Sequence, residues 1–80
     1  MAGTDEDYLA LGSALRVLRR RAHLTQAEAA AKVDVRNTHI SSVERGERGL
    51  SYRTMLALTR AYGATLRELV EEIERGEVSA

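Results

Sequence analysis

The chain contains no cysteine and no proline among its 80 residues. Without cysteine there is no disulfide, thiolate metal ligand or thiol nucleophile, and this inventory is typical of a cytoplasmic protein. No apolar run approaches the roughly 18 residues that cross a bilayer, and the opening MAGTDEDY lacks the basic start of a signal peptide. We therefore expect a cytoplasmic protein that does not contact a membrane.

Histidine is also scarce, because His23 and His39 are the two that the chain contains. Two isolated histidines and scattered carboxylates supply no set of nucleophile, base and orienting group, and no third ligand for a metal ion. The sequence thus predicts no enzymatic activity, no metal or cofactor, and no small-molecule ligand.

The size of the chain limits it to one domain. With 44% apolar residues in 80, it can form one modest core, so residues 1–80 are predicted to be a single domain. A domain this small is only marginally stable, and self-association would add burial.

Charge is balanced overall but not along the chain. The formal net charge is zero, yet residues 16–60 carry ten Lys and Arg against four Asp and Glu, and the two ends are acidic. A basic middle suits a partner rich in phosphates, because binding responds to the local field more than to net charge. A solvated surface with accidental charge segregation is the alternative.

Apolar residues recur at three- and four-residue spacing and never alternate, which predicts an all-α fold. Thr25 with Glu28 and Thr65 with Glu68 have the spacing of capping boxes, and Ser51 is a further N-cap candidate. Helices are therefore expected from near the N-terminus to about residue 22, over 26–33 and 36–45, after residue 51, and after residue 65.

The second and third helices are separated by a short turn around Asp34. In the third helix Ile40 and Val43 face inward, and small uncharged polar residues face outward. Two short helices joined in this way are the components of a helix-turn-helix that reads duplex DNA.

The stretch LGSALRVLRRRAHLTQAEAAAKVDVRNTHISSVERGERGLS resembles the lambda-repressor and Cro-like (XRE-type) helix-turn-helix family, and the resemblance extends over about residues 8–74. It implies a compact five-helix fold in which helices two and three form the helix-turn-helix. It also implies double-stranded DNA as the partner. Three positions depart from the family pattern, because Asp34 and His23 stand where glycine is frequent and Ala29 stands where a larger aliphatic residue is common.

The resemblance implies a role for each matched residue. Base contacts fall on the third helix and the turn before it, at Asn37, Thr38, Ser41, Ser42 and Arg36. Phosphate contacts fall on Gln26, Arg48 and Arg53. His39 is expected on the same face, where it is either a further phosphate donor or an ordinary exposed histidine. Arg19 and Glu44 match a structural ion pair that links the first helix to the end of the third.

The fifth helix carries a large apolar stripe for a terminal helix. Its members, expected to form a two-fold interface, are Leu66, Leu69, Val70 and Ile73. The resulting prediction is a homodimeric, sequence-specific transcription regulator on a pseudo-palindromic operator, similar to restriction-modification controllers and small phage repressors. An antitoxin or protein-interaction module with the same fold is the alternative, and duplex binding that depends on salt would distinguish the two.

Overall fold

The computed structural model describes residues 6–79, and side chains up to residue 76. Within these residues the chain forms five helices and no strand, which confirms the all-α prediction. They are α1 (Glu6–Arg21), α2 (Gln26–Val33), α3 (Asn37–Glu44), α4 (Tyr52–Ala61) and α5 (Leu66–Ser79). None of these helices combines the length and apolar character needed to span a bilayer.

Local capping signals set where three of the helices begin. At α2 the Thr25 hydroxyl accepts from the Glu28 amide at 3.0 Å, and the Thr25 amide donates to the Glu28 carboxylate at 2.8 Å. Thr65 and Glu68 form the same reciprocal pair at α5, and Ser51 accepts a hydrogen bond from a first-turn amide of α4. Because each cap satisfies amides that have no partner within the helix, the predicted helix starts agree closely with the observed ones.

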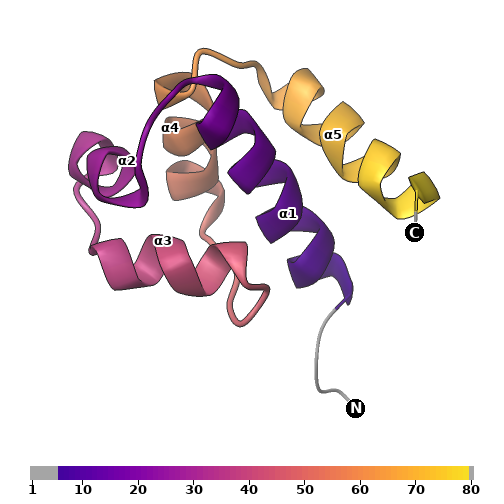
Figure 1. Ribbon diagram of the computed structural model, residues 1–80, viewed down its shortest axis with the longest axis horizontal. Coiled ribbons are helices and arrows are strands. Elements are labelled where there is room, and N and C mark those ends of the chain that lie inside the picture. The colour runs from indigo at the N-terminus through magenta and orange to yellow at the C-terminus, as the bar shows by residue number, and fades with distance from the viewer. Residues whose placement is uncertain (1–5, 80) are drawn as a thin grey trace.

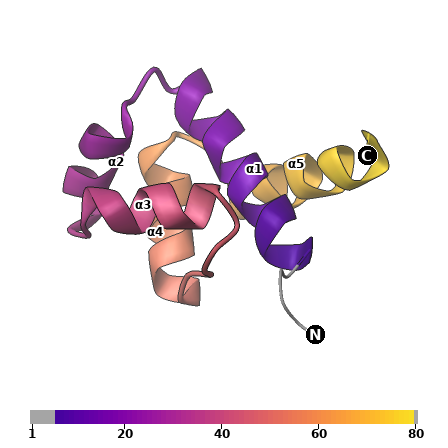
Figure 2. The same ribbon diagram turned by 60° about the horizontal axis from the view of Figure 1, so that its bottom comes forward.

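Helix α1 contacts α5 and α3, and α2 packs against α3 and α4 (Figure 1). In both views α5 lies along one side of α1, while α2, α3 and α4 lie on the other (Figure 2). The buried apolar residues between them come from all five helices: Ala14, Leu15, Leu18, Ala29, Ala30, Ile40, Val43, Leu58, Tyr62 and Leu69. The core therefore holds α3 against α1 while leaving its outer face in solvent.

Glycine in α1 allows this helix to contact the end of α3 directly. A Cβ atom added at Gly12 would collide with the Val43 carbonyl oxygen and lie 2.9 Å from that of Glu44. One turn earlier in α1, Leu9 packs on Gly46. Gly46 follows the end of α3 and has a φ of 76°. The last turn of α3 and the corner after it are thus fixed against α1 at backbone level.

The apolar stripe of α5 is used mostly inside the protomer, which corrects the prediction that all of it forms a dimer interface. Leu69 is 0% exposed in the isolated chain, so no partner subunit can reach it. Leu66 and Ile73 are partly buried against the core, and Val70 remains 44% exposed. The reason is the position of α5 along α1 (Figure 1), which places Leu69 in the core with Leu66 and Ile73 packed against it.

Candidate nucleic-acid interface

The turn between α2 and α3 is made by a residue other than glycine in the left-handed conformation. Asp34 has φ 58° and ψ 48°, and its amide donates to the Ala30 carbonyl oxygen. The Val35 amide donates to the same oxygen at 3.1 Å. Asp tolerates this conformation better than most residues, so the turn forms although the usual glycine is absent.

The outer face of α3 presents polar side chains without charge near its start. Asn37 and Thr38 are exposed, and Ile40 and Val43 on the inner face are each 1% exposed. Arg36, the residue before the helix, is exposed and its side chain makes no capping hydrogen bond. This end of α3 therefore offers amide, hydroxyl and guanidinium groups to a partner.

Two serines follow on the same helix, and both are only partly exposed. Ser41 and Ser42 lie one turn after Asn37 and Thr38. The Ser41 hydroxyl accepts a hydrogen bond from the Arg45 guanidinium, so it is already engaged in the free protein. Ser41 and Ser42 are thus less available for base contacts than Asn37 and Thr38.

The end of α3 is tied to α1 by a buried ion pair. Arg19 Nε donates to Glu44 Oε2 at 2.6 Å and Arg19 Nη2 donates to Glu44 Oε1 at 3.0 Å, while Nη1 donates to the Leu24 carbonyl oxygen at 2.8 Å. The Glu44 side chain is 1% exposed and that of Arg19 is 10% exposed. The pair predicted between these residues is therefore present, with the two-pronged geometry that makes Arg–carboxylate pairs specific.

The environment of Glu44 keeps its carboxylate charged. Burial raises the pKa of this carboxyl, but the hydrogen bonds from Arg19 and Gln26 and the positive charges of Arg19 and Arg16 outweigh it, so the pKa of Glu44 lies below its ordinary value. The hydrogen bond to Glu44 raises the pKa of Arg19 in turn, although burial opposes it. Both partners are ionised across the physiological range.

Gln26, predicted to contact a phosphate, is half-buried and already has a protein partner. Its Nε2 donates to Glu44 Oε1 at 3.0 Å. This bond occupies one of its two side-chain N–H groups and leaves the other, together with the carbonyl oxygen. The start of α2 is thereby fixed to the end of α3, which places Gln26 beside the ion pair.

His39 is placed differently from the prediction. The residue is half-buried, and its Nε2 atom is inaccessible and has no hydrogen-bond partner among the described residues. The predicted phosphate contact is therefore wrong for this atom, because the surrounding residues enclose it.

The segment after α3 carries the other two predicted phosphate contacts. Arg48 lies in the loop and Arg53 in the first turn of α4, and both are exposed. Between them Tyr52, at the first position of α4, is 62% exposed. The structure leaves these three side chains in solvent on the segment that follows α3.

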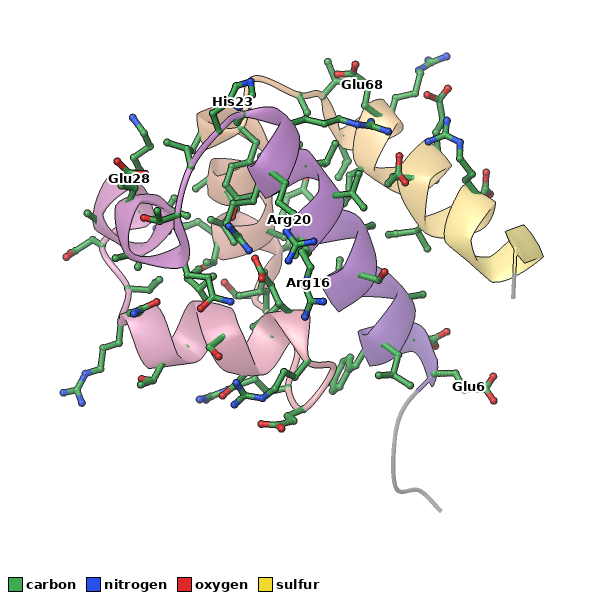
Figure 3. The ribbon with its side chains drawn as sticks, in the orientation of Figure 1. Glu6, Arg16, Arg20, His23, Glu28 and Glu68 are labelled. Atoms are coloured by element: carbon green, nitrogen blue, oxygen red, sulfur yellow. The ribbon has the colours of Figure 1, made fainter. Side chains whose placement is uncertain are left out.

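Three arginines near the ion pair were not among the predicted site residues. Arg16 Nε lies 3.6 Å from Glu44 Oε1 with its side chain 40% exposed, and Arg20 projects from the same side of α1 (Figure 3). Their spacing along one helix face was a usable signal. Arg45, at the end of α3, pairs with Glu47, and no helical spacing indicated this pair.

Taken together, the site is a polar helix face flanked by cations. The start of α3 offers groups that match base edges, and Arg36, Arg48 and Arg53 stand before and after it with charges that match phosphates. Within the described residues no group of histidine and acidic side chains has the arrangement of a metal site.

Comparison with known proteins places these elements in a wider group. The model of a family described as "helix-turn-helix domain" matches residues 10–73. The chain is 35% identical over 65 residues to the control protein C.MunI of a Mycoplasma species, a match that spans 80% of this chain and 88% of that protein.

Solved structures with the same arrangement include regulators from two bacteria. The clp gene regulator ClgR of Corynebacterium glutamicum is 27% identical with a TM-score of 0.86, covering 92% of this chain and 79% of that one. The restriction-modification controller protein C.AhdI of Aeromonas hydrophila is 33% identical with a TM-score of 0.74, covering 79% of this chain and 96% of that one.

Proposed function

Because the chain belongs to the helix-turn-helix domain family, we propose that it is a transcription regulator that binds duplex DNA through α3. The observation that carries the proposal is the exposed pair Asn37 and Thr38 at the start of α3. The other end of this helix is held against α1 by the ion pair of Glu44 with Arg19. Controller proteins and a gene regulator among the similar proteins support the same conclusion.

The proposed contacts divide into two kinds. Asn37 and Thr38 read base edges, since an Asn side chain pairs in two-pronged fashion with adenine and a Thr methyl group packs on thymine. Arg36 contributes at the same end of α3. Phosphate contacts come from Gln26, through the side-chain groups that Glu44 leaves free, and from the exposed loop cations Arg48 and Arg53.

The test is selection of binding sites from randomised duplex DNA at two salt concentrations. The wild-type protein should enrich one palindromic sequence, and the double variant Asn37→Ala, Thr38→Ala should lose that enrichment while retaining weak binding that depends on salt. Ser13→Ala is the control, because Ser13 is an exposed polar residue of α1 in the groove beside α5. Absence of enrichment by the wild-type protein would contradict the proposal and favour a protein-interaction module.

We further propose that the regulator acts as a homodimer on a two-fold operator. A two-fold dimer sets two copies of α3 about 34 Å apart, so that they enter successive major grooves. The exposed Val70 of α5, with the partly exposed Leu66 and Ile73 beside it, is the surface that supports this assembly.

Sedimentation of a Val70→Asp variant tests the dimer. This change should yield monomers with unaltered helicity, because Val70 is 44% exposed and not part of the core. Ala27→Asp, which adds the same charge at an exposed site on α2, should leave the dimer intact. A Val70→Asp protein that still dimerises would place the interface elsewhere.

We also propose that the chain is a controller of the restriction-modification type, which regulates its own promoter. The support is the similarity to C.MunI and C.AhdI. Transcription from its own promoter in a purified system should change as the protein concentration rises. A promoter that does not respond at saturating protein would contradict autoregulation.

A further inference from the structure

An exposed ion pair lies over the far end of α3. Arg45 Nε donates to Glu47 Oε2 at 2.9 Å, and Nη2 donates to Glu47 Oε1 at 3.1 Å. The remaining nitrogen, Nη1, donates to the Ser41 hydroxyl. The guanidinium is therefore turned back over the outer face of α3, one turn from the proposed base-contacting residues.

The backbone beneath this pair is fixed on both sides by α1. Glu44 is bound by Arg19, and Gly46 is covered by Leu9. Arg45 stands between these two anchored residues, and its own side chain is 51% exposed. Rearrangement of the pair therefore requires only side-chain rotation.

We propose that Arg45 is a phosphate contact for duplex DNA and that Glu47 occupies its guanidinium in the free protein. The inference rests on the function proposed above, and it adds a binding residue and a residue that competes for it. Glu47 holds the position that a backbone phosphate takes in the complex.

The chemistry of the two ligands makes the exchange straightforward. A carboxylate and a phosphate both accept the parallel N–H groups of a guanidinium. Arg45 uses three of its five N–H groups in the free protein. An ion pair this exposed contributes little to folding, so its loss on binding is not opposed by the fold.

Glu47 thereby lowers the affinity for DNA of any sequence. The hydrogen bond from Arg45 lowers the pKa of Glu47, so its carboxylate is charged at neutral pH. While the pair is closed, it offers no net charge to the phosphates. Opening the pair costs the same on any duplex, so Glu47 lowers the specific and the non-specific affinity together.

The test measures affinity for a short duplex of random sequence by fluorescence anisotropy, from about 50 to 200 mM salt. Glu47→Gln should tighten binding several-fold at the lowest salt. The slope of log K against log salt should stay close to that of the wild type, because Arg45 contacts the phosphate in both complexes, whereas Arg45→Ala should make it shallower by about 0.9, the value of one phosphate contact. Glu74→Gln, which removes an equal charge from the exposed face of α5, should change neither.

The double variant Arg45→Ala, Glu47→Gln distinguishes a direct exchange at Arg45 from simple repulsion of DNA by Glu47. If Glu47 acts by occupying Arg45, the gain from Glu47→Gln disappears in an Arg45→Ala background. A gain of equal size in that background, or no gain at all in a protein that still binds its selected site, overturns the inference alone. A wild-type protein that binds no duplex at any salt overturns the proposed function together with it.

Discussion

Replacing Glu44 by alanine should destabilise the domain by about 3 to 5 kcal/mol, the cost of leaving a buried charge without its partner. The Glu44 side chain is 1% exposed, and it accepts two hydrogen bonds from Arg19 and one from Gln26. Removing the carboxylate leaves the Arg19 guanidinium with one remaining hydrogen bond, to the Leu24 carbonyl oxygen.

That cost is large against the stability of so small a domain. The free energy of unfolding expected for a chain of this length is roughly 4 to 12 kcal/mol, at about 0.05 to 0.15 kcal/mol per residue. Glu44→Ala therefore removes between a quarter and all of the stability. The loss should appear as a lower midpoint of urea unfolding with an unchanged slope.

A double-mutant cycle isolates the pair itself. Arg19→Met combined with Glu44→Leu replaces both charges by apolar side chains, and such replacements are often close to neutral. We therefore expect the double variant to be more stable than either single variant. The coupling should be about 2 kcal/mol or more, a size seen for residues in direct contact.

The exposed pair of Arg45 and Glu47 supplies a matched control. Glu47→Ala removes a carboxylate with a similar two-pronged bond, yet the unfolding midpoint should hardly move because both side chains are in solvent. Two results would refute the reasoning from burial. One is a cost of Glu44→Ala under about 1 kcal/mol, the range of exposed pairs. The other is additive losses of stability from Arg19→Met and Glu44→Leu in the double-mutant cycle.

Three further predictions concern the stability of the fold. His23→Gly should stabilise the domain by about 0.5 to 1 kcal/mol, since His23 has a φ of 60° that glycine adopts without strain, whereas Ala31→Gly in the exposed face of α2 should destabilise it by about 1 kcal/mol. Gly12→Ala should destabilise by about 1 to 3 kcal/mol because the added methyl group meets the Val43 carbonyl oxygen. Stability should fall as the pH drops below about 4.5, because the pKa of Glu44 is lower in the folded protein than in the unfolded chain. The ionised carboxylate therefore stabilises the fold fully above the unfolded pKa, and this stabilisation is lost as the pH falls through the folded pKa.

Thermal or urea unfolding measures all three. A His23→Gly protein less stable than wild type would mean that the imidazole makes a stabilising contact. A Gly12→Ala protein with wild-type stability would show that α1 and α3 separate without cost. A Glu44→Gln variant should lose much of the acid-dependent slope, and retention of the full slope would assign it to other carboxylates.

Local patterns predicted most of the secondary structure correctly. The capping boxes at Thr25 and Thr65 and the cap at Ser51 gave the starts of α2, α4 and α5, because each cap involves residues within one helical turn. The inward positions of α3, Ile40 and Val43, also followed from spacing alone. These features depend on neighbours in the chain and need no knowledge of how helices pack.

The candidate site was predicted less completely, because its side chains also contact residues far away in the chain. Spacing placed Asn37 and Thr38 in solvent correctly. It did not show that Gln26 donates to Glu44, that Arg45 engages Ser41, or that the Nε2 atom of His39 is inaccessible. The placements of Gln26 and His39 depend on how one helix packs against another, whereas Arg45 and Ser41 are four residues apart and their bond depends on the rotamer of Arg45.

The sequence by itself thus determined the helix boundaries, the order of polar and apolar faces, and the ion pair that a family motif implied between Arg19 and Glu44. Only the tertiary structure decided which apolar residues remain for a partner. Leu69 belongs to the same stripe as Val70, yet it is 0% exposed while Val70 is 44% exposed. The physical reason is that a helical stripe specifies a face to be buried, whereas the packing of α5 along α1 decides how much of that face its own chain covers.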